Sequence, residues 1–184
     1  MFRRSRSAFA AAAVALTFAF VAQADLENAG EGKVEIHAVA KPALGKFSGE
    51  LDGVTAKERD GKLVFVAELP RGLKMGMRDS HTREVFKVDK HKQVKLSVDK
   101  SKLKFPEDNK KVEGEVKGDL TLHGVTKPVT VKYVAKRTGS DYHLKGTSFS
   151  FNYTDFGVEK ICKLSVCVEP QVTIRVDKLK LRQK

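Results

Sequence analysis

The segment MRDSHTREVF, residues 77–86, gathers the residue types with the most obvious chemistry. It places Arg78 and Arg83 on either side of Asp79 and His81. Aspartate, serine and histidine are the residue types of a hydrolytic triad, but adjacency in the sequence does not give the convergent geometry that a triad requires. Arginine side chains can instead hold a pyrophosphate or a carbonyl group. The segment therefore predicts either a contact for the polar end of a ligand or an Arg–Asp pair that anchors a loop, and the two roles are compatible.

Apolar side chains surround these polar groups. Leu73, Met75 and Met77 precede most of them, and Phe86 follows. Methionine is unbranched and polarizable, so it adapts its shape to irregular apolar ligands. If the segment contacts a ligand, Arg78 and His81 are the candidates for its polar end and these four side chains are candidates for its apolar part.

Motifs of the common catalytic classes are absent from the sequence. It has no G-x-S-x-G, no paired-carboxylate pattern and no metal-ligand pattern. The remaining histidines, His37, His91, His123 and His143, are scattered, and we expect them on wet faces or in turns. The sequence therefore predicts no enzyme, no cofactor and no metal site.

The two cysteines, Cys162 and Cys167, stand in CKLSVC. Their spacing is not the C-x-x-C of a redox pair, and nothing nearby completes four zinc ligands. A close, even pair in an exported protein typically forms a local disulfide. Closing so small a loop would contribute about 2 kcal/mol in the chain-entropy model.

The N-terminal 24 residues predict an export signal. Arg3, Arg4 and Arg6 form a positive region, a short apolar run follows, and Ala22-Gln23-Ala24 is a small-x-small cleavage site. We expect residues 25–184 to form one domain, located in the bacterial periplasm or secreted.

The charge of the chain is strongly positive. The sequence has 35 lysines and arginines against 23 acidic residues, a net charge of +12. Removing the three arginines of the export signal leaves 32 basic residues against 23 acidic ones, a net charge of +9. Such a charge attracts polyanions, although a lysine-rich soluble surface has the same composition. Without tryptophan or a recognisable nucleic-acid motif, we expect no nucleic-acid partner.

Alternating apolar residues predict an all-β domain. The clearest strand is KVEGEVKGDLTLHG, residues 111–124, in which every second residue is apolar or glycine. Further strand-like segments occupy 34–40, 47–56, 62–69, 94–98, 129–137, 141–153 and roughly 170–181, while residues 70–90 predict a loop or a helical turn. Asp60-Gly61 predicts a hairpin turn between the second and third of these segments. Shifts in the alternation predict a bulge or break near residues 99–101 and another bulge in the last segment. About eight antiparallel strands joined by short turns favour a single barrel, which at this size holds one small ligand.

Two glycines fall on the apolar face of that clearest strand. Gly114 and Gly118 stand where a solid core would place bulky side chains. Their missing side chains would either leave room for a ligand tail or allow close packing of neighbouring strands. The sequence leaves both alternatives open.

Parity and bulk indicate which side chains would face the interior of such a barrel. Phe149 and Phe151 share one face and are the strongest aromatic candidates. The full set of candidates is Phe65, Leu96, Val116, Leu120, Leu122, Val131, Phe149, Phe151 and Ile174. From the pattern alone, these residues would simply fill a solid core.

Three segments give the chain a resemblance to the YceI-like family of exported lipid-binding proteins. They are GDLTLHGVTKPVTVKY (118–133), MRDSHTREVF (77–86) and FSFNYTDFGV (149–158). The resemblance implies a lipocalin-like barrel with an elongated apolar interior that binds polyisoprenoids, isoprenoid quinones or similar long-chain amphiphiles. It also adds Phe156, from the D-F-G-V part of the third segment, to the ligand-binding candidates. An aromatic–proline pair common in the family is replaced here by His91-Lys92.

Three hypotheses follow, with different partners. The first is a periplasmic protein that binds, transports or stores an amphiphilic lipid. The second is a basic envelope or adhesion protein with a solid core and polyanion partners, and the third is a lipid-modifying enzyme with a dispersed site. The sequence leaves peripheral membrane contact and dimer formation open.

Overall fold

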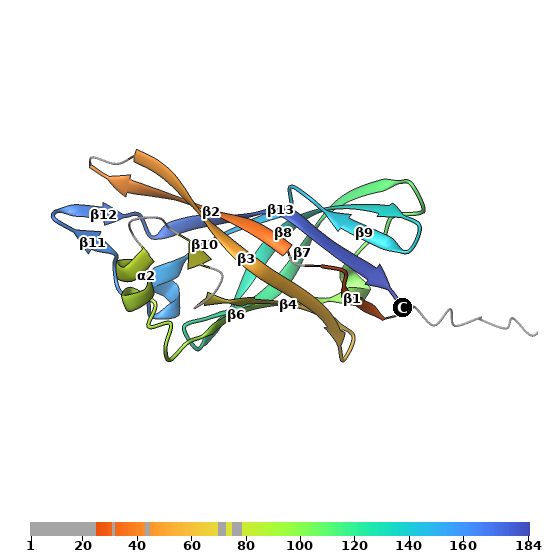
Figure 1. Cartoon of the computed structure of the whole chain (residues 1–184), viewed down its shortest axis with the longest axis horizontal. Coiled ribbons are helices and arrows are strands. Elements are labelled where there is room, and N and C mark those ends of the chain that lie inside the picture. The colour runs from red at the N-terminus through yellow and green to blue at the C-terminus, as the bar shows by residue number, and fades with distance from the viewer. Residues whose placement is uncertain (1–24, 31, 43–44, 70–72, 75–78) are drawn as a thin grey trace, which may run out of the picture.

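The strands of this protein pair into one curved antiparallel sheet (Figure 1). The computed structural model describes residues 25–30, 32–42, 45–69, 73–74 and 79–184, without the side chains of Leu73, Asp79 and His81. The predicted export signal, residues 1–24, lies outside the described residues.

The described strands differ widely in length. They are β1 (Leu26–Asn28), β2 (Gly32–Lys41), β3 (Gly45–Arg59), β4 (Lys62–Glu68), β5 (Leu73–Lys74), β6 (Gln93–Asp99), β7 (Lys111–Leu122), β8 (Val125–Thr138), β9 (Asp141–Leu144), β10 (Ser148–Asn152), β11 (Cys162–Lys163), β12 (Val166–Val168) and β13 (Gln171–Gln183). The helical elements are α2 (Asp79–Val85) and the 3-10 turns η2 (Lys100–Lys102) and η3 (Tyr153–Phe156).

Eight of these strands close into a ring. The order is β2-β3-β4-β6-β7-β8-β10-β13, and β13 pairs back with β2 through partners such as Arg175 and Glu35. Closure pairs most of the strand edges around the barrel, which reduces the aggregation hazard of an open sheet. The predicted all-β fold, a single antiparallel barrel of about eight strands, is confirmed.

Two positions in the ring are each shared by two strands. β1 and β2 both lie between β3 and β13, and β9 and β10 both lie between β8 and β13. The predicted continuous strand 141–153 is therefore interrupted at residues 145–147. β10 and β8 share a single paired position, Ser148 with Lys132, so the barrel wall is loosely joined there.

Turn chemistry fixes the register of the hairpins. Asp60 and Gly61 have φ values of 52° and 71°, the left-handed backbone of a two-residue hairpin turn. This turn joins β3 and β4 where the sequence predicted a hairpin. The predicted irregularities are also present, as η2 after β6 and as a register shift between Val176 and Lys178 in β13.

The two ends of the barrel carry different elements (Figure 1). At one end, which we call the hairpin end, lie the short helix α2 and the hairpin β11–β12. At the other, the terminal end, lie β1, β9 and the C-terminus. The helix α2 is the helical turn that the sequence allowed within residues 70–90. No helix among the described residues has the length and apolar character needed to span a membrane.

The two glycines of β7 resolve the alternative that the sequence left open. A Cβ on Gly114 would lie 2.5 Å from the Tyr133 hydroxyl oxygen, and one on Gly118 would lie 3.0 Å from the Ser97 carbonyl oxygen. Neither glycine lines the cavity described below. Their role is therefore close packing, and they provide no space for a ligand tail.

Candidate functional site

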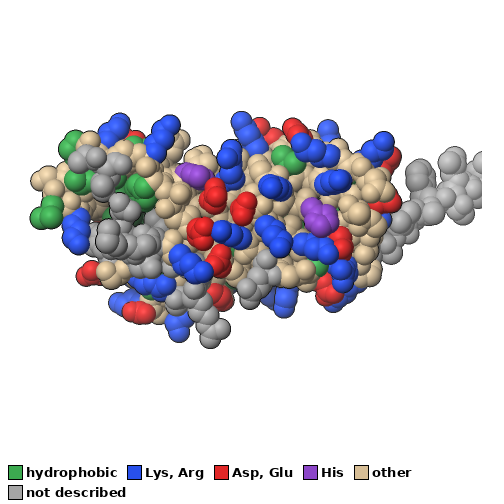
Figure 2. Space-filling view, turned by 45° about the horizontal axis from the view of Figure 1, so that its top comes forward, with side chains coloured by type: hydrophobic (Ala, Val, Ile, Leu, Met, Phe, Trp, Pro, Cys, Tyr) green, Lys and Arg blue, Asp and Glu red, His purple; other side chains and the backbone are tan. Residues whose placement is uncertain are grey.

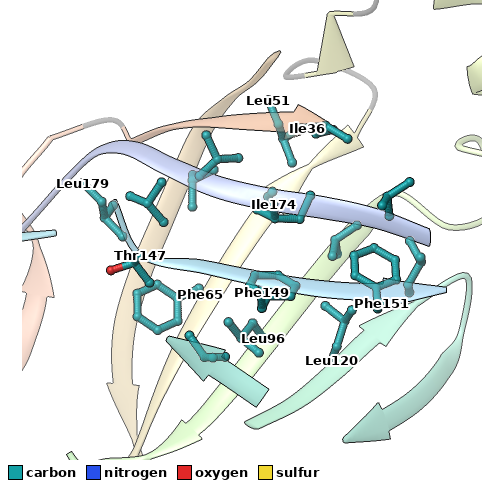
Figure 3. A pocket seen from close by; sticks show the side chains of 18 of the residues that line it. Ile36, Leu51, Phe65, Leu96, Leu120, Thr147, Phe149, Phe151, Ile174 and Leu179 are labelled. Atoms are coloured by element: carbon teal, nitrogen blue, oxygen red, sulfur yellow. The ribbon is translucent and has the colours of Figure 1, made fainter. Parts of the chain in front are cut away.

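The interior of the barrel contains an elongated apolar cavity of about 490 Å³. Each of the eight ring strands contributes lining side chains. In Figure 3, Phe65, Leu96 and Phe149 project from three different strands into the same space. The solid core of the polyanion-binding hypothesis is therefore wrong for this barrel.

The cavity runs through most of the length of the barrel. At the terminal end its walls include Leu26, Tyr142 and Leu181, and at the hairpin end they include Ile161 and Val168. The lining between these groups consists almost entirely of aliphatic side chains and phenylalanines, and its hydroxyl groups come from a few tyrosines and threonines. A long, narrow apolar space of this kind matches an extended hydrocarbon chain better than a compact ring system.

The cavity reaches the protein surface beside the hairpin. Four of its lining residues are exposed, and three of them, Cys162, Lys163 and Leu164, belong to β11–β12. The fourth, Lys104, precedes β7 at the terminal end, where its backbone N–H donates to the Tyr133 hydroxyl at 2.8 Å. The hairpin is therefore the main place where solvent and cavity meet.

A buried tyrosine anchors the base of this hairpin. Tyr153 has no exposed surface, and its hydroxyl donates to the Val168 carbonyl at 2.9 Å and accepts from the Ile161 N–H at 3.2 Å. Burial raises the pKa of the Tyr153 phenol. The hydroxyl thus connects both arms of the hairpin to the barrel wall while the ring lines the cavity.

Other polar groups in the lining also have partners within the protein. The Thr147 hydroxyl accepts from the Val134 N–H at 3.0 Å and lies 3.3 Å from the Val134 carbonyl. Among the described residues, the buried side-chain atoms without a hydrogen-bond partner are Asn28 Oδ1 and His123 Nε2, and neither residue lines the cavity. Among the described residues, the cavity lining therefore offers apolar contact and no unpartnered buried side-chain atom.

The terminal end is held by buried and partly buried charges. Lys100 Nζ lies 2.5 Å from Glu58 Oε2, and their side chains are 7% and 11% exposed. The same carboxylate accepts from the Leu26 N–H at 3.1 Å, so one acidic group joins β1, β3 and η2.

A second charged cluster joins β9 to β13 at the same end. Asp141 accepts from Arg182 Nε at 2.8 Å and lies 2.6 Å from Lys180 Nζ. The hydrogen bonds from Arg182 and Lys180 hold the pKa of the Asp141 carboxyl well below its usual range.

Two histidine rings lie against each other at a tilt of 53° at the hairpin end. The rings of His91 and His123 have centroids 4.2 Å apart, and His123 occupies the left-handed turn between β7 and β8 with φ 52°. Desolvation lowers the pKa of His123, and the neighbouring His91 and Lys87 act in the same direction. A hydrogen bond to the Phe156 backbone opposes this shift, as does the charge of Glu159.

Most of the predicted interior residues lie in the cavity wall. These are Phe65, Phe86, Leu96, Val116, Leu120, Leu122, Val131, Phe149, Phe151 and Ile174. Their inward direction follows from the alternation of each strand, and Figure 3 labels Phe65, Leu96, Leu120, Phe149, Phe151 and Ile174. Their contact with a ligand remains a prediction.

Phe156 occupies a different place from the other candidates. It is 1% exposed, does not line the cavity, and packs edge-on against Phe151 with ring centroids 5.5 Å apart. It belongs to η3, next to the loosely joined strands β8 and β10. We interpret it as a plug in the barrel wall. Its contact with a ligand stays a prediction, and η3 places its ring outside the cavity wall.

The polar segment 77–86 is described only in part. Met75, Met77 and Arg78 lie outside the described residues, as do the side chains of Leu73 and His81. The polar-end role that the sequence predicts for this segment therefore stays a prediction. Its described part forms α2, and Phe86 just after that helix reaches the cavity wall.

The predicted disulfide between Cys162 and Cys167 is present, with a Cα–Cα distance of 4.1 Å. The two residues are direct partners across β11 and β12. Sequence reasoning missed that this hairpin lines the cavity, and it also missed the cavity residues of the terminal end. Leu164, which stands between the two cysteines, was the available signal that the hairpin lines the cavity. The cavity residues of the terminal end depend on the pairing of β1 with β13, which joins segments far apart in the sequence.

The family model described as "YceI-like domain" matches residues 23–178. Curated relatives described as "UPF0312 protein" include one from Pseudomonas savastanoi pv. phaseolicola, 36% identical over 122 residues. Another, from Pseudomonas fluorescens, is 38% identical over 125 residues. These alignments cover 57% and 56% of this chain, and only 62% of each relative.

Two solved structures share the fold at low sequence identity. One is a polyisoprenoid-binding domain from Saccharophagus degradans implicated in plant cell wall breakdown, with a TM-score of 0.70 and 13% identity over 88% of this chain and 99% of that one. The other is BcnA from Burkholderia cenocepacia, with a TM-score of 0.57 and 17% identity over 82% of this chain and 96% of that one.

Proposed function

The chain belongs to the YceI-like family, and on that premise we propose that it binds one long-chain amphiphile in the barrel cavity. The guest is a polyisoprenoid, an isoprenoid quinone or a fatty-acid-like lipid. We further propose that the protein transports or stores this lipid in the periplasm.

The observation that carries this proposal is the apolar cavity itself. Its volume of about 490 Å³ falls within the range of roughly 300–1,000 Å³ that is usual for small-molecule sites. The structural similarity to a polyisoprenoid-binding domain supports a chain of isoprene units as the guest. The described buried polar atoms that lack partners lie elsewhere, so the guest needs few polar groups along its length.

Burial of hydrocarbon supplies enough free energy for such binding. Each buried methylene contributes about 0.8 kcal/mol, so one five-carbon unit contributes up to about 4 kcal/mol. Two or three units would offset the roughly 4–15 kcal/mol cost of immobilising a ligand. Because the cavity is narrow, slender chains would gain this energy and bulky ones would not.

The position of the exposed lining residues orients the guest. The cavity meets the surface at the hairpin, so the polar head of the lipid would remain there in water while the tail extends toward Leu181. The predicted polar contacts of the segment 77–86 would then serve the head.

Native mass spectrometry of the gently purified protein tests the proposal. The expected result is a complex carrying one lipid, which extraction then identifies by its mass. Protein without any retained lipid, together with heparin binding that falls steeply with salt, would contradict the proposal and favour a polyanion partner. Conversion of the retained lipid over time would indicate an enzyme.

A matched pair of substitutions tests whether the lipid lies in the cavity. Val131 lines the cavity, whereas Val129, two residues earlier on the same strand face, is equally buried but does not. Val131→Phe should fill free space, leave the free energy of unfolding unchanged or higher, and lower the retained lipid at least tenfold. Val129→Phe should overpack its site at a cost of about 1–3 kcal/mol and retain the lipid. Equal lipid retention in both variants would place the lipid outside the cavity.

A further inference from the structure

The tip of the β11–β12 hairpin presents a leucine that the folded chain does not use for packing. Leu164 is 91% exposed, and the other large apolar side chain exposed in the described residues, Val125, is only 36% exposed. Leu164 has a φ of 48° and the following Ser165 a φ of 65°, so the turn is left-handed at both positions. Such turns favour glycine, asparagine or aspartate. A leucine there adds strain and exposes apolar surface, and neither helps the chain to fold.

Several contacts hold this leucine in a fixed place. The disulfide Cys162–Cys167 closes the hairpin just behind the turn, and β12 pairs with β2 at Ala40 and Lys41. The hydrogen bonds of the buried Tyr153 hydroxyl, described above, secure the base. The hairpin is therefore a supported projection.

The surroundings of Leu164 are basic and apolar. Lys160 and Lys163 are exposed on the hairpin segment, and no acidic residue lies between Glu159 and Glu169 in the sequence. Glu169 is paired with Lys41 Nζ at 2.5 Å, and Glu159 is exposed. Figure 2 shows hydrophobic side chains gathered at this end of the molecule with Lys or Arg side chains beside them.

We propose that the β11–β12 hairpin docks on an anionic lipid bilayer, inserting Leu164 among the headgroups while Lys160 and Lys163 contact phosphate. One apolar tip flanked by cations suits a lipid surface, where a single side chain gains by burial. A stable protein interface would instead require roughly 1,000 Å² of contact. Because three exposed cavity residues belong to the hairpin, docking would place the opening of the cavity against the bilayer.

Docking as a step in lipid exchange rests on the proposed function, but docking itself does not. It can be measured with delipidated protein and vesicles that hold no candidate guest. Vesicle binding by a protein that retains no lipid would support docking and contradict the proposed lipid binding. Retained lipid without vesicle binding would support lipid binding and contradict docking.

The absence of tryptophan from the chain allows a direct test. Leu164→Trp introduces one fluorophore at the hairpin tip, and Asp60→Trp introduces one at the opposite end. The control is well matched because Asp60 is also exposed and also begins a two-residue left-handed turn, with φ 52°. Vesicles of equal parts phosphatidylglycerol and phosphatidylcholine are the probe, with pure phosphatidylcholine vesicles as the uncharged comparison.

The expected result is a blue shift of Leu164→Trp emission with the anionic vesicles and none for Asp60→Trp. Vesicle sedimentation should show about a tenfold loss of partitioning for Leu164→Asn, which keeps a turn-compatible residue. Lys160→Gln and Lys163→Gln should each lower partitioning roughly fivefold at low salt. Circular dichroism of each variant confirms that it is folded.

Two outcomes would overturn the proposal. One is unchanged Leu164→Trp emission with anionic vesicles, which would show that the tip does not enter the bilayer and would favour a protein partner for Leu164. The other is an equal response of the two tryptophan variants, since general attraction of a basic protein to an anionic surface would then explain binding without the hairpin.

Discussion

The terminal end and the hairpin end of the barrel are held together by different interactions. At the terminal end, Glu58 and Lys100 form a buried ion pair, and Asp141 joins β9 to β13 through two cations. At the hairpin end, a disulfide and a buried tyrosine hydroxyl support a projecting apolar turn. One end thus concentrates its charges in the fold, whereas the other presents apolar surface to its surroundings. Under the proposed function, the terminal end would serve stability and the hairpin end would serve lipid exchange.

The largest expected effect on stability comes from breaking the buried pair at the terminal end. Lys100→Met would leave the Glu58 carboxylate buried without its partner ammonium group, at a cost of about 3–5 kcal/mol in the free energy of unfolding. Urea denaturation measures this change. The double variant with Glu58→Leu should recover most of the loss, because it also removes the unpaired charge.

The same kind of change at the hairpin end provides the control. Lys163 is exposed, so Lys163→Met should alter the free energy of unfolding by no more than about 0.5 kcal/mol. A loss at Lys163 as large as that at Lys100 would contradict the proposed division between the two ends.

Removal of the disulfide should have a smaller effect. Replacing Cys162 and Cys167 together by serine should lower the free energy of unfolding by about 2 kcal/mol, because the unfolded chain loses a short closed loop. Reduction of the native protein should give the same change in urea denaturation and should leave the double variant unaffected. If the reductant also destabilised the double variant, the Cys162–Cys167 disulfide could not be the cause of the change in stability.

The charged cluster at Asp141 predicts a pH dependence at the acidic extreme. Its carboxyl has a pKa below the ordinary value near 3.8, so the folded state binds fewer protons than the unfolded state in that range. The stability it provides is complete above pH 5 and is lost as the pH falls below about 4. Thermal unfolding of Asp141→Asn should show a small decrease in Tm at pH 7 that disappears toward pH 2. A constant difference across that range would exclude the ionised carboxylate as the cause.

The contact between His91 and His123 predicts the smallest effect on stability, at milder pH. His123 has a folded-state pKa below its ordinary value of 6.5, so the unfolded state binds a proton first on acidification. Stability should therefore fall as the pH drops below about 6.5, with no further loss below the lowered pKa. His123→Asn keeps a residue that tolerates the left-handed turn and should weaken this dependence between pH 7.5 and 5.5. An unchanged slope in chemical denaturation would assign the dependence to other groups.

The fold was largely predictable because strand alternation and hairpin turns are local signals. Parity alone placed Val116 and Leu120 inside the barrel. Turn chemistry placed Asp60-Gly61 in a hairpin turn. Ring closure through β13 and β2 is a long-range pairing that no local pattern contains.

The cavity was less predictable than the barrel that encloses it. The pattern that places Val131 inside is the same for a filled core and for a hollow one, so only the family resemblance favoured a cavity. Phe156 became a ligand-binding candidate only through the family resemblance, and its place outside the cavity wall follows from a 3-10 turn that strand alternation does not predict. The ring contact between His91 and His123 joins two loops that are distant in the sequence, and the sequence contains no local signal for it.

A crystal structure of the protein with its copurified lipid tests the central claim most directly. We predict continuous elongated density inside the barrel, running from Leu181 at the terminal end to the side of Leu164 at the hairpin end. A barrel interior filled by repacked side chains, with the lipid bound on the outer surface, would contradict the account.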